Sequence, residues 1–182
     1  MLKILQTELK EVFIMEYAVN QDNRAIFHRT FSKELLLNSG VFTEFTEEIS
    51  YHPMKKDTLY GIHFQNHPKP QAKLIYCAKG RILDFAIDLR SNSETYKKWV
   101  CVELNEDNKR QLYIPHGFGH AALTLVDNSN IVMRIDNAFD PSLSKAIRYD
   151  DKEIALNITA SDIILSSQDN IAPFLADSDC NL

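Results

Sequence analysis

The stretch KLIYCAKGRILDFAIDLR, residues 73–90, decides the fold that the sequence predicts. It holds two apolar runs rich in aliphatic and aromatic residues, Lys73–Cys77 and Ile82–Leu89, with the turn-forming pair Lys79-Gly80 between them. Short apolar or alternating runs on either side of a glycine turn are typical of neighbouring antiparallel strands. The stretch therefore predicts two strands joined by a tight turn.

Runs of the same kind extend to both sides of this stretch. They are Gly61–Gln65, Trp99–Leu104, Gln111–Ile114, Ala121–Val126 and Ile131–Ile135. Short strands at roughly ten-residue intervals, separated by turn residues, indicate a β-sandwich or barrel. Helix is expected only in short pieces, over Ser32–Leu37 and near Ser161–Leu165 or Ser167–Asn170.

The composition is that of one globular domain spanning residues 1–182, because 45% of the residues are hydrophobic and no linker or repeat divides the chain. The net charge of −5 argues against a nucleic-acid partner. No run of 18 apolar residues predicts a membrane span, and Met1–Val12 lacks an export pattern, so we expect a cytoplasmic protein without a membrane partner. The widely spaced Cys77, Cys101 and Cys180 indicate reduced thiols.

A set of ordered motifs carries a family resemblance. They are Lys55–Gln65, Gln71–Leu74, Gly80–Arg90, Leu112–His120, Ile147–Asp151 and Leu165–Asp169, together with a looser match over Asp22–Phe27. In these motifs the chain resembles the dTDP-4-dehydrorhamnose 3,5-epimerase family. The resemblance implies an all-β cupin jelly roll with a few short helices, a homodimer, and a nucleotide-linked 4-keto sugar as the ligand, without a cofactor.

The resemblance also implies the role of each site residue. The carbonyl at C4 of such a sugar acidifies the hydrogens on C3 and C5, so that a base can remove one and leave an enolate. The match assigns His63 as this base, Asp169 as the carboxylate that orients it, and Lys73 as the cation near the C4 oxygen. The positions that match the substrate-binding set are Arg24, Tyr60, Gln65, Asp84, His120 and Met133.

The segment Pro115–His120 has the form Pro-x-Gly-x-x-His, which is one half of the signature of metal-dependent cupins. The other half is missing, because Gln65 stands where a second histidine would follow His63, and His67 lies about 13 Å further along a strand. We therefore expect no metal.

The chain departs from the family pattern at several positions. Counting back eight residues from Pro141 places Met133 where the family has a catalytic tyrosine, and a thioether has no proton to transfer. Tyr60 replaces an arginine, and Arg29 and Gln168 replace a glutamate and a lysine.

Three interpretations of these departures remain open. The chain is an epimerase acting at C3, C5 or both of a 4-keto-6-deoxy sugar, with Tyr60, Tyr76, another nearby group or water supplying the proton. Alternatively, it is a 3,4-isomerase of keto sugars, which uses the same acidity of the carbon-bound hydrogens. In the last alternative it is a non-catalytic sugar-nucleotide-binding homologue.

Overall fold

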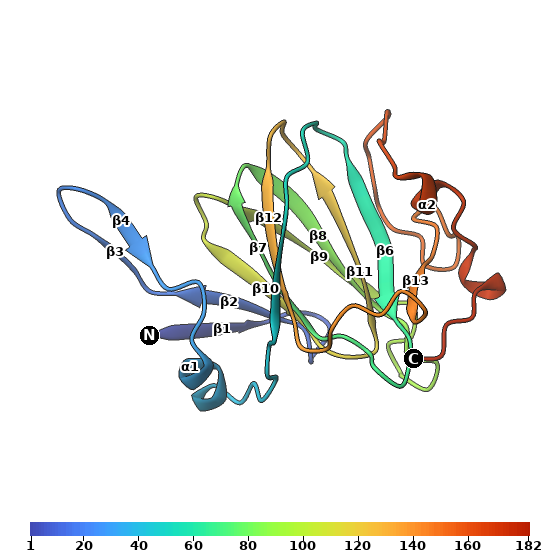
Figure 1. The fold of residues 1–182 in the computed structure, drawn as a ribbon, viewed down its shortest axis with the longest axis horizontal. Coiled ribbons are helices and arrows are strands. Elements are labelled where there is room, and N and C mark those ends of the chain that lie inside the picture. The colour runs from blue at the N-terminus through green and yellow to red at the C-terminus, as the bar shows by residue number, and fades with distance from the viewer.

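The computed structural model describes residues 1–182 and consists mainly of two antiparallel sheets packed face to face (Figure 1). The six-stranded sheet has the order β1 (Leu2–Gln6), β2 (Phe13–Tyr17), β10 (Arg110–Ile114), β7 (Lys73–Lys79), β12 (Asn130–Ile135) and β5 (Glu47–Tyr51). The five-stranded sheet has the order β13 (Ser144–Ala146), β6 (Leu59–Gln65), β11 (Phe118–Thr124), β8 (Arg81–Asp88) and β9 (Trp99–Asn105). The predicted all-β sandwich is confirmed.

The smaller elements lie outside the two sheets. The hairpin of β3 (Val19–Gln21) and β4 (Ile26–His28) projects away from the sandwich, and α1 (Lys33–Asn38) follows it (Figure 1). Near the carboxyl end lie α2 (Ser167–Asn170) and the 3₁₀ turn η1 (Leu175–Asp177). Ser32 caps α1 by accepting a hydrogen bond from the backbone N–H of Leu35, as the sequence predicts.

Every strand predicted between residues 61 and 135 is present, with shifted ends. Outside this range the structure adds β1, β2, β5, β13 and the β3–β4 hairpin. The expected alternative helix over Ser161–Leu165 is wrong, whereas the one over Ser167–Asn170 is confirmed. Ile164 instead forms a parallel bridge to Thr58. Its backbone N–H and C=O are hydrogen-bonded to Asp57 and Leu59, so they are not available for the hydrogen bonds of a helix.

Two apolar clusters enclose the five-stranded sheet. One fills the space between the sheets, with Ile75, Ala86 and Met133 among its buried members. The other lies on the outer face of the five-stranded sheet, where Leu59 and Ile62 pack with residues of the carboxyl-terminal segment. The chain after β13 thus acts as a cover for the outer face, and it brings α2 next to β6 (Figure 1).

A bulge in β6 determines which side chains of that strand face the interior. His63 pairs with His120 of β11, but Tyr60 pairs with Ala122, so the register shifts between them at Gly61. Gly61 has a φ of +91°, and a Cβ atom there would lie 2.4 Å from the carbonyl oxygen of His120. The bulge places Tyr60 and His63, three residues apart, on the same face of the strand.

We therefore expect Gly61→Ala to be much more destabilising than Gly40→Ala. Both glycines have a positive φ, which costs a residue with a Cβ atom about 1–2 kcal/mol. At Gly40 nothing lies within 4 Å of the added carbon, whereas at Gly61 the overlap with backbone adds a further ~1–3 kcal/mol. Urea unfolding of both variants measures the difference, and equal losses would show that the bulge tolerates a side chain.

Candidate functional site

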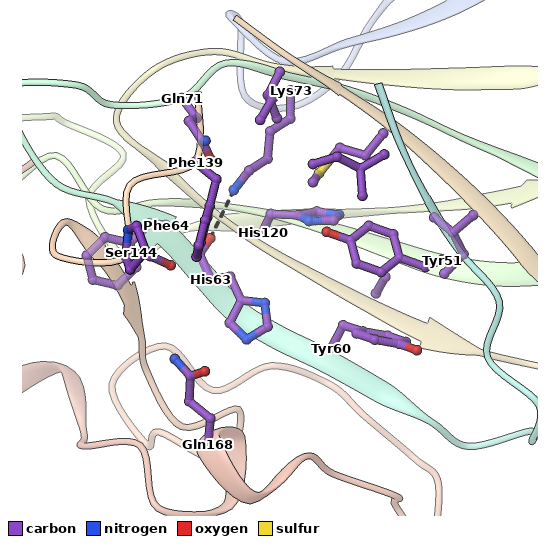
Figure 2. A pocket seen from close by; sticks show the side chains of 16 residues that line it. Tyr51, Tyr60, His63, Phe64, Gln71, Lys73, His120, Phe139, Ser144 and Gln168 are labelled. Atoms are coloured by element: carbon purple, nitrogen blue, oxygen red, sulfur yellow. Dashed lines mark hydrogen bonds between the residues drawn. The ribbon is translucent and has the colours of Figure 1, made fainter. Parts of the chain in front are cut away.

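A cavity of about 330 Å³ opens between the two sheets (Figure 2). The six-stranded sheet contributes the wall of Ile49, Tyr51, Lys73, Ile131, Met133 and Ile135. The five-stranded sheet contributes the wall of Tyr60, His63, Phe64, His120, Ala122 and Ser144, loops add Gln71, Phe139 and Pro141, and α2 adds Gln168. The cavity thus has one largely apolar wall and one wall that carries two imidazoles.

His63 is held by a carboxylate from the far end of the chain. Its Nε2 lies 2.5 Å from Oδ1 of Asp169, whose side chain is only 4% exposed. Asp169 is in the short helix α2, which Ser166 caps by accepting a hydrogen bond from the Asp169 N–H. Because Nε2 is engaged by the carboxylate, Nδ1 is the ring nitrogen left to accept a proton from a ligand.

The charge state of Asp169 suits this role. Burial by itself raises the pKa of its carboxyl, but the hydrogen bond from His63, the charge on that ring, and further bonds from Ser166 and the Gly61 backbone bring the pKa below its ordinary value. The group is therefore a carboxylate at neutral pH. An anion behind the imidazole stabilises the imidazolium that forms when His63 takes a proton.

A second imidazole–carboxylate pair lies deeper in the same wall. The His120 Nε2 is 3.1 and 3.0 Å from the two oxygens of Asp84, which is fully buried. Lys73 comes from the opposite sheet, is 4% exposed, and donates from Nζ to the backbone oxygen of His63 at 3.3 Å (Figure 2). The structure thus brings His63, Asp169, Lys73, His120 and Asp84 to one site, as the sequence analysis expects.

Burial lowers the pKa of Lys73 to about 8, and the negative charges of Asp84 and Asp136 oppose that shift. The ammonium form therefore predominates at pH 7, but it is close to losing its proton. A cation fixed in a buried site stabilises a developing negative charge more strongly than a cation in water does. Lys73 is placed to stabilise an anion that forms inside the cavity.

Of the remaining predicted residues, two line the cavity and two do not. Tyr60 and Met133 line the cavity. Gln65 is buried beside it and holds the adjoining loop, because its amide donates to the carbonyl oxygens of Lys69 and Ala138. Arg24 lies on the β3–β4 hairpin, exposed and paired with Asp22, so the chain does not bring it to its own cavity.

Two observations bear on the missing proton donor. Tyr76, one of the donors considered from the sequence, is on β7 but stacks under the guanidinium of Arg134, 5.5 Å from its ring centre, and does not line the cavity. Tyr51, which the sequence analysis missed, does line it. The signal was present in Glu47–Tyr51, where Ile49 and Tyr51 alternate with polar residues as in a half-buried strand.

Comparison with known proteins places this chain in a family. The family model described as dTDP-4-dehydrorhamnose 3,5-epimerase matches residues 6–177. The chain belongs to this family. The resemblance noted from the sequence motifs is therefore confirmed, and the family's enzymes are isomerases.

Curated relatives and solved structures agree with this assignment. The dTDP-4-dehydrorhamnose 3,5-epimerase of Shigella flexneri is 32% identical over 179 residues, covering 98% of each chain. The enzyme of Escherichia coli K12 is 34% identical, covering 92% of this chain and 91% of its own. The dTDP-6-deoxy-D-glucose-3,5-epimerase of Legionella pneumophila, solved with dTDP-4-keto-L-rhamnose, superposes with a TM-score of 0.94 at 28% identity, covering 98% and 95% of the two chains.

A further solved structure is the Bacillus anthracis dTDP-4-dehydrorhamnose 3,5-epimerase, which contains TDP and pyrophosphate. It superposes with a TM-score of 0.93 at 32% identity, covering 96% of this chain and 99% of that one. These matches confirm the cupin-like β-sandwich. Separately, none of the helices is long and apolar enough to span a membrane.

If Lys73 acts as a cation, kcat/KM should fall as the pH rises through about 8, because the pKa of this lysine in the free protein is about 8 and the neutral amine cannot stabilise an anion. Lys73→Arg should keep reduced activity and lose this alkaline decline, since a guanidinium stays protonated. The pH–rate profiles of the two proteins provide the measurement. An identical decline in both would assign it to another group.

Proposed function

We propose that this protein is an epimerase that acts at C3, C5 or both of a nucleotide-linked 4-keto-6-deoxy sugar. The observation that carries the proposal is the His63 imidazole, which lines the cavity. The Asp169 carboxylate lies 2.5 Å from its Nε2, and Lys73 donates a hydrogen bond to the His63 backbone oxygen. A base, a carboxylate that supports it and a buried cation are the three groups that enolisation next to a carbonyl requires.

The reaction begins when Nδ1 of His63 removes the hydrogen from the carbon next to the C4 carbonyl. The electron pair of that C–H bond forms a carbon–carbon double bond, and the carbonyl pair moves to the C4 oxygen. Lys73 stabilises the resulting oxyanion, and Asp169 stabilises the imidazolium. Return of a proton from the opposite side of the sugar ring then inverts the carbon and restores the ketone.

His120 contributes a second group to the charged wall. Asp84 fixes its ring through Nε2, and the charge of the same carboxylate acts on Lys73. With Nε2 occupied, Nδ1 of His120 is free to contact the ligand. We infer that His120 orients the sugar and helps to bind the C4 oxygen while Lys73 supplies the net charge.

Support for the ligand class comes from the relatives and from the apolar wall on the six-stranded sheet. The Legionella enzyme was solved with dTDP-4-keto-L-rhamnose and the Bacillus enzyme with TDP, which supports a dTDP-linked sugar here. The wall of Ile49, Ile131, Met133 and Ile135 suits an apolar part of the ligand, such as the methyl group of a 6-deoxy sugar. The same proposal places the protein in the cytoplasm, where nucleotide-activated sugars are available.

Isomerisation between C3 and C4 is the second candidate, and Met133 favours it. A site with His63 as its only proton-transferring group returns the proton to the face from which it was taken, so the carbonyl can migrate without inversion. Binding without catalysis is the remaining alternative. Solvent exchange separates the three, because an epimerase inverts, an isomerase exchanges protons or moves the carbonyl, and a binding protein does neither.

His63→Asn should abolish incorporation of deuterium into dTDP-4-keto-L-rhamnose in D₂O, because the base is lost while a side chain of similar shape remains. Asp169→Asn should slow exchange by roughly 10²-fold or more, since the imidazolium loses its counter-charge. NMR of the C3 and C5 positions measures both.

His116→Asn is the matched control. His116 also pairs with a carboxylate, at 2.6 Å from Asp136, but it does not line the cavity. Exchange should continue in this variant. Full exchange in His63→Asn would refute the assigned base, and absence of exchange in the unaltered protein would leave a binding function.

We also propose that the protein is a homodimer in which Arg24 reaches the cavity of the second copy. The β3–β4 hairpin extends away from the sandwich, and its Ile26 and Phe27 are each 55% exposed (Figure 1). A projecting two-stranded hairpin with exposed apolar side chains is marginal in water and is stabilised by burial against another surface. A guanidinium carried on it would suit a diphosphate.

Light scattering at micromolar concentration should give twice the chain mass of 20.9 kDa. Phe27→Asp should shift the protein towards the monomer, because it places a charge in the apolar contact. Phe42→Asp is the control, since Phe42 is 76% exposed but lies outside the hairpin. A monomeric unaltered protein would contradict the proposal.

A further inference from the structure

The proposed epimerisation needs a proton donor on the wall opposite His63, and Met133 cannot be that donor. We propose that the donor is the phenol of Tyr51, on the edge strand β5. This inference rests on the proposed function and adds to it a catalytic residue on a different strand from the family position. The donor has moved from β12 to its neighbour in the sheet.

The sheet register places Tyr51 close to Met133. In the antiparallel pair of β5 and β12, Tyr51 lies opposite Ile131, and Met133 lies opposite Ile49. Tyr51 and Met133 are therefore diagonal neighbours on one face of the sheet, a separation that an aromatic side chain can span. All four side chains line the cavity. A phenol at Tyr51 can thus reach the region that a phenol at Met133 would occupy.

The direction of the side chains distinguishes Tyr51 from the other tyrosines. Figure 2 shows the Tyr51 hydroxyl pointing into the cavity towards His120, whereas the Tyr60 hydroxyl points away from it. The two rings pack with centres 5.5 Å apart and a tilt of 55°, so Tyr60 supports the Tyr51 ring. Tyr76 is excluded by its place under Arg134 outside the cavity.

The two proton-transferring groups then belong to opposing sheets. His63 is on β6 of the five-stranded sheet, and Tyr51 is on β5 of the six-stranded sheet. A sugar bound between the sheets has one ring face towards each wall. Abstraction by one group and delivery by the other therefore invert the carbon, which a single group on one wall cannot do.

The step balances without a redox partner. The electron pair on the C4 oxygen re-forms the carbonyl, and the electron pair of the carbon–carbon double bond takes the proton of the Tyr51 hydroxyl. The Tyr51 phenolate then takes a proton from solvent, and the His63 imidazolium releases its proton to solvent. Burial, with Tyr60 adding to it, raises the pKa of Tyr51 above its ordinary value. The phenol is therefore protonated and ready to donate at neutral pH.

The test uses dTDP-4-keto-L-rhamnose in D₂O and follows exchange and inversion separately by NMR. Tyr51→Phe should slow inversion by roughly 10²- to 10⁴-fold, while exchange on the His63 side falls by less than about tenfold. Adding Met133→Tyr to Tyr51→Phe should restore inversion in part, because a phenol returns to the same region from the neighbouring strand.

Tyr76→Phe is the matched control, because it removes a phenol from the same sheet outside the cavity, and its ratio of inversion to exchange should be unchanged. Unaltered inversion in Tyr51→Phe would overturn the donor role and leave the epimerase intact. Exchange without inversion in the unaltered protein would overturn both the donor and the epimerase in favour of the isomerase. Loss of inversion in both Tyr51→Phe and Tyr76→Phe would also overturn the donor role.

Discussion

The bulge at Gly61 is the constraint on which the site depends. A regular strand would send Tyr60 and His63 to opposite faces, because side chains alternate. The backbone at Gly61 takes a φ of +91° against the carbonyl of His120, so both side chains enter the cavity while Leu59 and Ile62 join the outer cluster. A single glycine thus directs the His63 side chain into the cavity and keeps Leu59 and Ile62 packed on the outer face of the five-stranded sheet.

The same strand also anchors the segment that completes the base. Backbone bonds join Ile164 to Asp57 and Leu59 at the start of β6, and α2 follows directly, so Asp169 reaches His63 across 106 residues of sequence. The site then holds two carboxylates behind two imidazoles, and one lysine from the opposite sheet. Each buried carboxylate needs a hydrogen-bonded partner. Lys73 lines the cavity and Asp84 does not, so a ligand that becomes negative at C4 faces the ammonium group rather than that carboxylate.

The strands between residues 61 and 135 could be predicted from the sequence, because alternating apolar residues and turn residues are local signals. The pairing of His63 with Asp169 came through the resemblance, because no local signal links positions so far apart. The bulge was not predicted, because Gly61 stood at the start of the predicted strand Gly61–Gln65, whereas a glycine signals a bulge when it lies inside a strand pattern. The strand of Tyr51 has a local signal in its alternating residues, but its position beside Met133 depends on the pairing of β5 with β12, which the sequence does not show.

Two departures from the family pattern, Met133 and Tyr60, fit together once Tyr51 is considered. An arginine at position 60 would place a positive charge beside the Tyr51 ring and favour the phenolate, which cannot donate a proton. The neutral phenol of Tyr60 acts in the opposite direction and raises the pKa of Tyr51 further. The change at Met133 removes one donor, and the change at Tyr60 preserves another. A neutral aromatic neighbour at position 60 therefore helps to keep the relocated acid protonated.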